Sequence, residues 1–547
     1  MELDNKTKIK FSVLAIISIV IFCIAIAPIS LQNDTFYTVK IGEHILEHGI
    51  DMQDPFSWHE LPYTYPHWAY DVGMYLVFKV GGYTGIYVTT VILTAILGIV
   101  IYTVCTKYTG NRLVSFLVTM LTMYMLRDFI AARAQLVTFI LFVLTIFFIE
   151  KFLETRKMRY AVFLVVIPIM IANLHLAVWP FYFVLYLPYI GEYAISYISK
   201  TSSLYRKLQI KMLKRKLGKV QKPEIMNLCA EKITRIENKE IETTIKSDKL
   251  KANPYKINVE RNANIKFLIL IMVICLFTGF LTPLGSTPYT YLIKTMKGNT
   301  TEYINEHMPL TLINNQEFLS LLILYFAILM FTDTKIRLKD LFLSGGLLVL
   351  ALKTRRQTSM FIMLGSSIIA KLISDIFNKY DKGGCEKVIK QMVTFGGKLI
   401  TIGVVLIISA YTIKPKVKDE FVSKSSYPIQ AAEFIRKNID LKNMRLYNEY
   451  NYGSYLLMQD IPVFIDSRAD LYTPEFNGKK DIFSDFINIA NIGTYYEDKF
   501  DEYEITHVLI YKNARLNMFI SKSDRYEELY SDDYFLFYKR LEMGDVE

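Results

Sequence analysis

The stretch "FSVLAIISIVIFCIAIAPISLQNDTFYTVKIGEHILEHG", residues 11–49, decides the class of protein. Residues 11–31 are almost all apolar, and about 20 such residues cross the hydrocarbon core of a bilayer as one helix. Polar sequence follows at once, and residues 38–49 repeat apolar side chains at helical spacing before Gly49. The stretch therefore predicts a membrane-spanning helix that leads into a folded loop. Cleavage of the run as a secretory signal is disfavoured, because Pro28 directly follows the small residues that resemble a cleavage site.

The rest of the chain extends this pattern. It has 547 residues, of which 52% are hydrophobic, and this composition excludes a single soluble domain. Ten further apolar runs are candidate spans, and the run at 340–352 is the weakest. We expect an α-helical polytopic membrane protein with about 11 spans, whose later runs lie at 83–106, 112–126, 135–153, 159–173, 176–198, 265–283, 316–332, 340–352, 358–374 and 398–414.

The distribution of charge predicts the orientation. Residues 200–266 hold 18 Lys or Arg against 7 Asp or Glu, so this segment alone accounts for the net charge of +11. Because the excess positive charge is confined to this one segment, a nucleic-acid partner is disfavoured. A basic segment between spans is typical of a loop on the cytoplasmic side. We therefore expect a transmembrane domain at 1–414 with a cytoplasmic N-terminus, a first outer loop at 32–82 and a basic cytoplasmic insert at 199–265. The remainder, 415–547, then lies outside the membrane on the extracytoplasmic side.

The segment 415–547 has the composition of a soluble domain. The stretches "MRLYN", "PVFID" and "THVLIY" predict strands, "YEELYSDDYFLFYKR" predicts a hairpin, and helical segments lie between them. A small α/β domain follows from this alternation. Its charged group Asp466, Arg468 and Asp470 favours a salt-bridged turn that holds the domain against the outer loops. The five cysteines are scattered, so neither a disulfide framework nor a thiolate metal site is indicated.

Several acids and histidines of the first outer loop are candidates for chemistry. Asp34 lies just past the first apolar run, at the depth where the head of a lipid-borne substrate would lie, and a carboxylate there would serve as a general base. His67 and Asp71, four residues apart, would orient an acceptor or form a structural pair. A metal pair at His44 and His48 lacks a third ligand, so no metal site is predicted, although dependence on a divalent metal is left open.

Two sets of cations lie on the outer side, against the usual bias. They are Arg127 with Arg133, the latter near Gln135, and Lys353 with Arg355 and Arg356. Cations retained there favour an anionic partner, and a planar guanidinium suits a phosphate or diphosphate. The other polar residues expected in the same outer chamber are Asn173, His175, Glu306 and His307.

Motifs along most of the chain carry a family resemblance. Asp34, "GEHILEHG", "DPFSW", "HWAYD", "ARAQLVTF", "NLHLAVW", "KTRRQTSMFIM", "NEYNYGSYLL" and "PVFIDSRADLY" resemble landmarks of bacterial multi-span proteins of the glycosyltransferase C (GT-C) superfamily, in a largely uncharacterised branch. The resemblance implies an enzyme of the bacterial cytoplasmic membrane that moves a sugar from a polyprenyl-phosphate or polyprenyl-diphosphate carrier to a glycan or protein acceptor. Asp34 would be the base, while Arg133 and Arg356 would bind the donor phosphate.

Two features depart from that family pattern. Thr35 follows Asp34 where many GT-C enzymes have a second acid, so Asp54 would have to serve as the partner of Asp34, or activity is lost. The basic insert has no obvious counterpart in the family. The alternative function is a non-catalytic protein that binds or transports an envelope lipid. A transporter would place its ionisable residues within the spans, whereas here the acids concentrate in a loop, which favours the enzyme.

Overall fold

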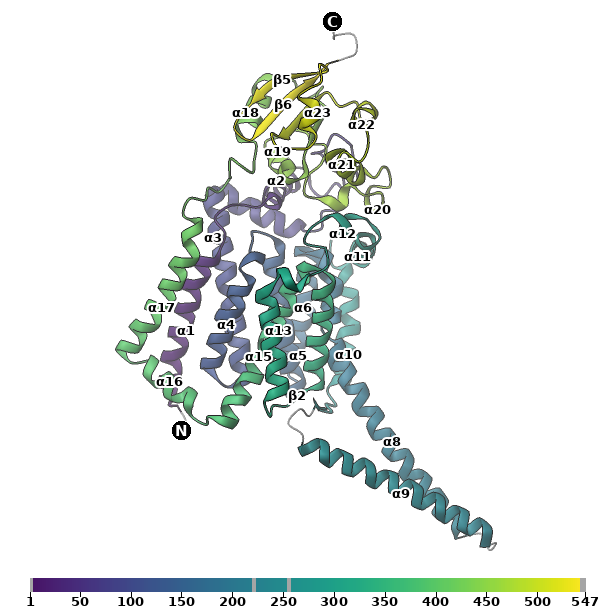
Figure 1. The fold of residues 1–547 in the computed structure, drawn as a ribbon. Coiled ribbons are helices and arrows are strands. Elements are labelled where there is room, and N and C mark those ends of the chain that lie inside the picture. The colour runs from purple at the N-terminus through teal and green to yellow at the C-terminus, as the bar shows by residue number, and fades with distance from the viewer. Residues whose placement is uncertain (1–2, 219–222, 253–256, 542–547) are drawn as a thin grey trace.

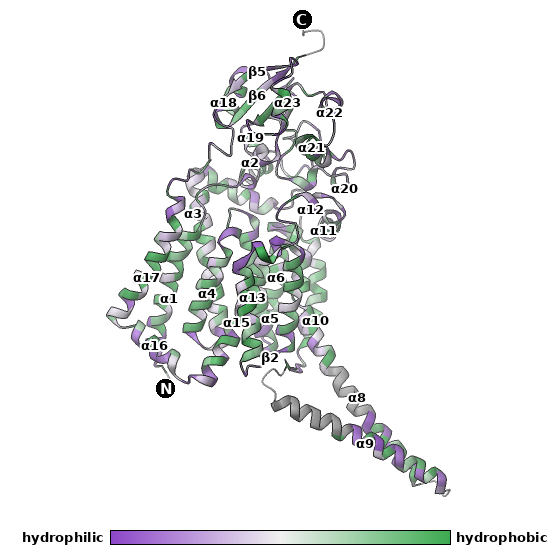
Figure 2. Cartoon of the chain, viewed as in Figure 1, coloured by the Kyte–Doolittle hydropathy of each residue, from purple (hydrophilic) through white to green (hydrophobic). Residues whose placement is uncertain are grey.

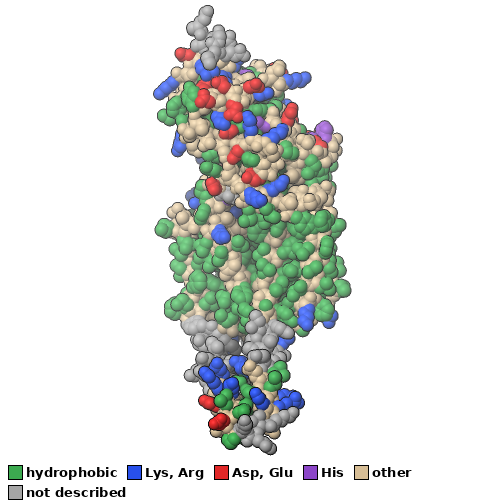
Figure 3. Space-filling model, turned by 90° about the vertical axis from the view of Figure 1, so that its right-hand side faces the viewer, with side chains coloured by type: hydrophobic (Ala, Val, Ile, Leu, Met, Phe, Trp, Pro, Cys, Tyr) green, Lys and Arg blue, Asp and Glu red, His purple; other side chains and the backbone are tan. Residues whose placement is uncertain are grey.

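The structure is a computed structural model that describes residues 3–218, 223–252 and 257–541. A bundle of helices carries a mixed α/β unit at one end and a long helical hairpin at the other (Figure 1). We call these the upper and lower ends of the bundle. The helices of the bundle are mostly apolar (Figure 2), and a belt of hydrophobic side chains covers the face of the bundle seen in Figure 3.

Within the described residues, five helices are long and apolar enough to cross a membrane: Asn5–Ile26, Trp68–Thr109, Ala134–Thr155, Arg355–Tyr380 and Phe395–Lys416. Shorter apolar helices, Met158–Leu174, Ile265–Phe280 and Gln316–Phe331, stand beside them. The prediction of a helical membrane protein is therefore confirmed in outline. The remaining runs form α4 (Arg112–Leu126), α14 (Leu338–Lys353) and the broken segment described below.

Local sequence fixes the ends of these helices. The carboxylate of Asp4 accepts a hydrogen bond from the backbone N–H of Thr7 and caps α1 (Asn5–Ile26), and Asn111 caps α4 in the same way. Helix α3 (Trp68–Thr109) begins well before the predicted run at 83 and turns at Gly82, where φ is 57°. Glycine adopts this conformation without strain. The part of α3 before Gly82 therefore belongs to residues 32–82, the segment predicted to be the first loop.

The run at 176–198, expected to be one span, is broken. It divides into a 3-10 turn at Leu176–Val178, α7 (Trp179–Val184) and the start of α8 (Leu187–Leu217). Pro180 and Pro188 explain the division, because proline lacks the N–H that continues a helix and is accepted mainly in its first turn.

The first loop, residues 32–82, shares a hydrophobic core with the C-terminal segment, and some of its residues also contact the bundle. Its helix α2 (Asn33–His48) ends at Gly49, as predicted, with φ 81°. Phe36 on α2 meets the rings of Tyr427 and Tyr455 at centroid distances of 4.9 and 5.3 Å. One hydrophobic core, separate from that of the bundle, includes both segments. We call the first loop and residues 415–541 together the upper unit.

The upper unit contains a mixed four-stranded sheet in the order β3-β4-β6-β5. Its strands are β3 (Leu446–Asn448), β4 (His507–Tyr511), β5 (Tyr526–Ser531) and β6 (Phe535–Arg540). The predicted hairpin is confirmed as β5–β6. The prediction of a strand at "PVFID" is wrong: the side chain of Asn448 bonds Phe464 N and Ile465 O there, and the segment makes only a bridge from Val463 to Ser57. The C-terminal segment also contains helices α18 (Ile429–Asn438), α19 (Tyr450–Met458), α21 (Ile482–Ala490) and α22 (Tyr496–Glu502), with the short helices α20 (Pro474–Asn477) and α23 (Asn517–Ile520).

The basic insert forms a helical hairpin of α8 and α9 (Pro223–Ala252) that projects from the lower end (Figure 1). An ion pair ties its base to the bundle. Arg337, which directly precedes α14, lies 3.2 Å from the buried Glu192 of α8, and Lys339 of α14 pairs in turn with Glu150 of α5 (Ala134–Thr155) within the bundle. The hairpin therefore leaves the bundle from an anchored base at the end opposite the upper unit.

Candidate functional site

Asp34 lies at the junction of the bundle and the upper unit. It is in the first turn of α2, where the helix dipole favours a negative charge. Arg133 immediately precedes α5, and its Nε lies 2.9 Å from Asp34 Oδ2. Its Nη1 lies 3.3 Å from Oε1 of Glu306, in the segment between α12 (Thr300–Tyr303) and α13 (Gln316–Phe331). Three predicted residues, far apart in sequence, thus form one ion-paired group.

The second predicted set of cations adjoins this group through the backbone. Arg356 N donates to Glu306 O at 2.9 Å, and Arg355 N donates to Met308 O at 3.0 Å. These bonds hold the short turn before α15 (Thr358–Tyr380) against the segment that carries Glu306. In the part of the chain that the structure describes, neither Arg355 nor Arg356 forms an ion pair through its side chain. The guanidinium group of Arg356 acts on Glu306 only at longer range, because it lowers the pKa of that carboxylate without a direct ion pair.

Charges in this group shift one another's ionisation. Burial alone would raise the pKa of Glu306, but Arg133 and Arg356 outweigh it and lower that pKa, so Glu306 is a carboxylate at neutral pH. Burial opposes the charge on Arg133, yet Asp34 and Glu306 raise its pKa. The group thus has fixed charges of both signs. It excludes a purely apolar ligand from this part of the junction.

Two predicted histidines lie beneath the cations. The rings of His67 and His175 are 5.0 Å apart, and Thr138 Oγ1 lies 2.8 Å from His175 Nδ1. Burial, reinforced by Arg356 and Arg133, lowers the pKa of His67 to about 3. Burial also lowers the pKa of His175 well below its usual value. Both rings are neutral at pH 7, so they support the site without adding positive charge.

The C-terminal segment reaches the site beside Asp34. Asn33 Nδ2 donates to Tyr450 O at 2.9 Å, which joins the start of α2 to the start of α19. Asp470 Oδ2 accepts from Tyr291 Oη at 3.0 Å and from Thr295 Oγ1 at 3.1 Å, both on α11 (Thr287–Lys297). Sequence reasoning missed Asn33, Tyr450 and these partners of Asp470. No motif signals such contacts, because each joins segments that lie far apart in the chain.

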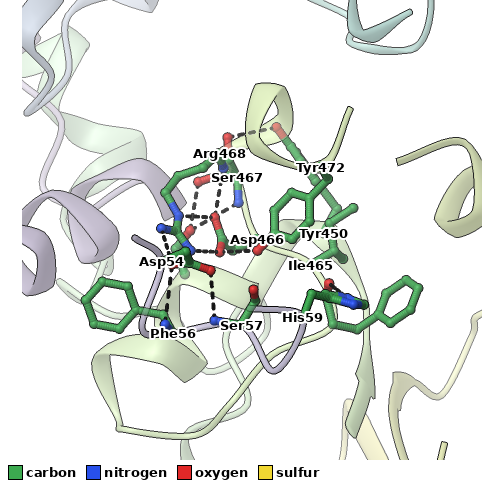
Figure 4. Close-up of polar contacts among 12 residues, drawn as sticks. Asp54, Phe56, Ser57, His59, Tyr450, Ile465, Asp466, Ser467, Arg468 and Tyr472 are labelled. Carbon is green, nitrogen blue, oxygen red and sulfur yellow. Dashed lines mark hydrogen bonds and ion pairs between the residues drawn. The ribbon is translucent and has the colours of Figure 1, made fainter. Parts of the chain in front are cut away.

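Asp54 has a different environment from that proposed for a partner of Asp34. Its Oδ1 lies 2.7 Å from Arg468 Nη1, and its Oδ2 accepts from Ser57 N at 3.0 Å (Figure 4). Arg468 also binds Asp466 through Nε and Nη2, at 2.9 and 2.6 Å. The side chains of Asp54 and Asp466 are fully buried. Asp54 thus belongs to a structural cluster, and we exclude it from the candidate site. The predicted salt bridge between Asp466 and Arg468 is observed.

Three other predicted residues lie outside the ion-paired group. Asp71 is fully buried where α2 crosses the first turn of α3, and neither of its carboxylate oxygens has a hydrogen-bond partner among the described residues. Asn173 accepts from Trp68 Nε1 at 3.1 Å and donates to two backbone carbonyls. Arg127 is paired with Glu317 at 2.8 Å. The half-buried Gln135 on α5 has no hydrogen bond through its side chain within the described ranges. His307 lies near Arg356, and burial lowers the pKa of His307.

Metal binding receives no support from side-chain positions. Over residues 3–218, 223–252 and 257–541, no group of three or more His, Cys, Asp or Glu is arranged to hold a metal ion. His44 and His48 stack at a centroid distance of 4.7 Å, and His44 Nε2 contacts Asp51 at 3.0 Å instead.

Comparison with known proteins leaves the family open. No family model matches the chain, and no curated protein matches it significantly. Resemblance to the GT-C superfamily therefore rests on the quoted motifs alone.

Proposed function

We propose that the protein is a GT-C-type glycosyltransferase of the bacterial cytoplasmic membrane. It moves a sugar from a polyprenyl-phosphate or polyprenyl-diphosphate carrier to a glycan or protein acceptor outside the cell. The observation that supports this most is the Asp34–Arg133–Glu306 group with Arg356 beside it, whose backbone N–H donates to Glu306 O and whose charge lowers the pKa of Glu306. A candidate base and several phosphate ligands thus share one place at the upper end of the bundle.

The proposed orientation follows from charge. The basic hairpin lies at the lower end and the upper unit at the opposite end (Figure 1). Basic segments remain preferentially on the cytoplasmic side. The upper unit would accordingly face outward, the N-terminus inward, and the bundle would cross the membrane up to 11 times. Asp34 then lies at the outer boundary of the bilayer, where a carrier lipid presents its sugar.

In this proposal the ion pairs of the resting site change when the donor binds. Arg133 leaves the carboxylates for the donor phosphate, helped by Arg355 and Arg356, neither of which forms a direct ion pair among the described residues. Asp34, released from Arg133, accepts the proton of the acceptor hydroxyl. That oxygen forms a bond to the anomeric carbon as the carbon–oxygen bond to phosphate breaks. The carrier phosphate leaves with the electron pair, and the guanidinium groups stabilise its charge.

The test is transfer of radiolabelled sugar from polyprenyl-phosphate donors by the purified protein in nanodiscs. Asp34→Asn keeps the size of the side chain and should lower turnover by at least about 100-fold, the lower range for loss of a general base. Asp128→Asn is the matched control, since Asp128 is a 77% exposed carboxylate at the same end of the bundle. Full activity of Asp34→Asn would refute the role of base. Tight donor binding by the wild-type protein without any transfer would instead favour the envelope-lipid binding protein.

A further inference from the structure

A second concave site lies on the opposite face of α2 from Asp34. Glu43 follows Asp34 by nine residues, about two and a half helical turns, and so projects from the other side of the helix. There an open groove of about 320 Å³ runs along the seam between α2, Pro55–Phe56 and the segment from Leu457 to Pro462. Seams between packed segments are preferred places for ligands, and this volume suits a small one.

The lining of the groove includes one flat surface. The exposed His48 stacks on His44 with an angle of 19° between the planes, while Tyr65 stacks on His44 as well and Phe56 meets it edge-on at 5.8 Å, so the open ring face is that of His48. Leu457, Ile461 and Pro462 also line the groove, and Pro462 is the most exposed of the three. Sugar rings present C–H faces that pack on such surfaces, while their hydroxyl groups remain free for hydrogen bonds at the rim.

The rim carries an excess of negative charge. Lys40 Nζ lies 2.7 Å from Glu43 and 2.6 Å from Asp460, so its charge is already neutralised. Glu47 is exposed, and its side chain has no hydrogen-bond or ionic partner where the structure describes the chain. Carboxylates accept hydrogen bonds from hydroxyl and ammonium groups and repel anions. The groove therefore selects against phosphate and uronic acid groups.

We propose that this groove binds a neutral or amine-bearing glycan through the exposed ring of His48, which His44 supports from behind, and the rim carboxylates Glu43, Glu47 and Asp460. Given the proposed function, on which this step rests, the glycan is the acceptor chain, held at a distance from its reacting end. A site so far from the reacting atoms contributes binding without entering the chemistry. It favours acceptors long enough to pass around α2.

Binding of oligosaccharides to the full-length protein in nanodiscs tests the groove without using transfer. The probes are a glucosamine tetrasaccharide, its N-acetylated form and a galacturonate tetrasaccharide, measured by calorimetry. We expect the first two to bind, the free amine more tightly, and the galacturonate not to bind. The double variant Glu47→Gln with His48→Ala should weaken binding by at least about tenfold, the loss expected for one charge-assisted hydrogen bond. Glu527→Gln, an exposed carboxylate on β5, is the matched control.

The outcomes separate this proposal from the proposed function. Equal binding of galacturonate, no glycan binding at all, or unchanged affinity in the double variant would overturn the groove even if Asp34→Asn abolishes transfer. Asp34→Asn should bind the glycans as the wild type does. Groove-dependent binding by a protein that transfers no sugar would support the groove and contradict the enzyme.

Discussion

Arg468→Met should loosen the upper unit, because it leaves two buried carboxylates without their shared cation. Arg468 contributes one contact to Asp54, at 2.7 Å, and two side-chain contacts to Asp466, at 2.9 and 2.6 Å. Each hydrogen bond to a charged group contributes about 1.5–3 kcal/mol, but proton uptake by the carboxylates offsets part of the loss. Removal of one member of a buried ion pair typically costs about 3–5 kcal/mol, and we expect that range here.

Tryptophan fluorescence during thermal unfolding measures this change directly. Trp58 lies within the junction, where its Nε1 donates to Leu446 O at 3.1 Å, so its emission should change when the first loop separates from the sheet. For a unit of this size the predicted loss lowers the midpoint by at least about 6 °C. Asp54→Asn removes one of the contacts and should have a smaller effect. Arg436→Met, at an exposed arginine of α18, should leave the midpoint nearly unchanged.

A midpoint for Arg468→Met within about 1 °C of the wild type, well inside the shift that its contacts imply, would refute the reasoning. It would mean that the cluster contributes no net stability and that the shared hydrophobic core alone joins the first loop to the C-terminal segment.

Three further predictions concern the site, the sheet and a helix crossing. Arg356→Ala should raise KM for the polyprenyl donor by about tenfold, as expected for loss of one phosphate contact, and leave KM for the acceptor unchanged. Equal effects on both KM values would mean that Arg356 has only a structural role. Burial raises the pKa of Glu449 to about 7, so the stability of the upper unit should decrease as the pH rises from 5 to 8. In thermal scans, Glu449→Gln should make this decrease smaller. Gly42→Ala should destabilise the protein by about 1–3 kcal/mol, because its Cβ would overlap the carbonyl oxygen of Asp71; a neutral change would show that α2 shifts freely.

Periodicity in the sequence predicts the helices well, and local chemistry explains where it fails. The run at 135–153 falls within a single helix, the run at 11–31 is helical as far as Ile26, and Gly49 ends α2. The run at 176–198 is equally apolar but contains Pro180 and Pro188, whose effect depends on their place within a helix. "PVFID" has strand composition, yet the amide of Asn448 takes the hydrogen bonds that a neighbouring strand would have made.

The sequence predicts part of the candidate site because topology groups residues by side. Asp34, Arg133 and Arg356 were all expected at the outer ends of spans, and the structure brings Arg133 into contact with Asp34 and places Arg356 beside Glu306. The pairing of Asp54 with Arg468 joins residues 414 positions apart, and no local pattern specifies it. For the same reason the common core of the first loop and the C-terminal segment becomes visible only in three dimensions.

The most direct test of the proposed site is an experimental structure of the protein with a polyprenyl-phosphate sugar bound in nanodiscs. We expect the donor phosphate within hydrogen-bonding distance of Arg133 and Arg356, with the Asp34–Arg133 contact broken and the Asp34 carboxylate turned toward the anomeric carbon. A donor phosphate bound elsewhere, with the contact between Asp34 and Arg133 intact, would contradict the proposed site.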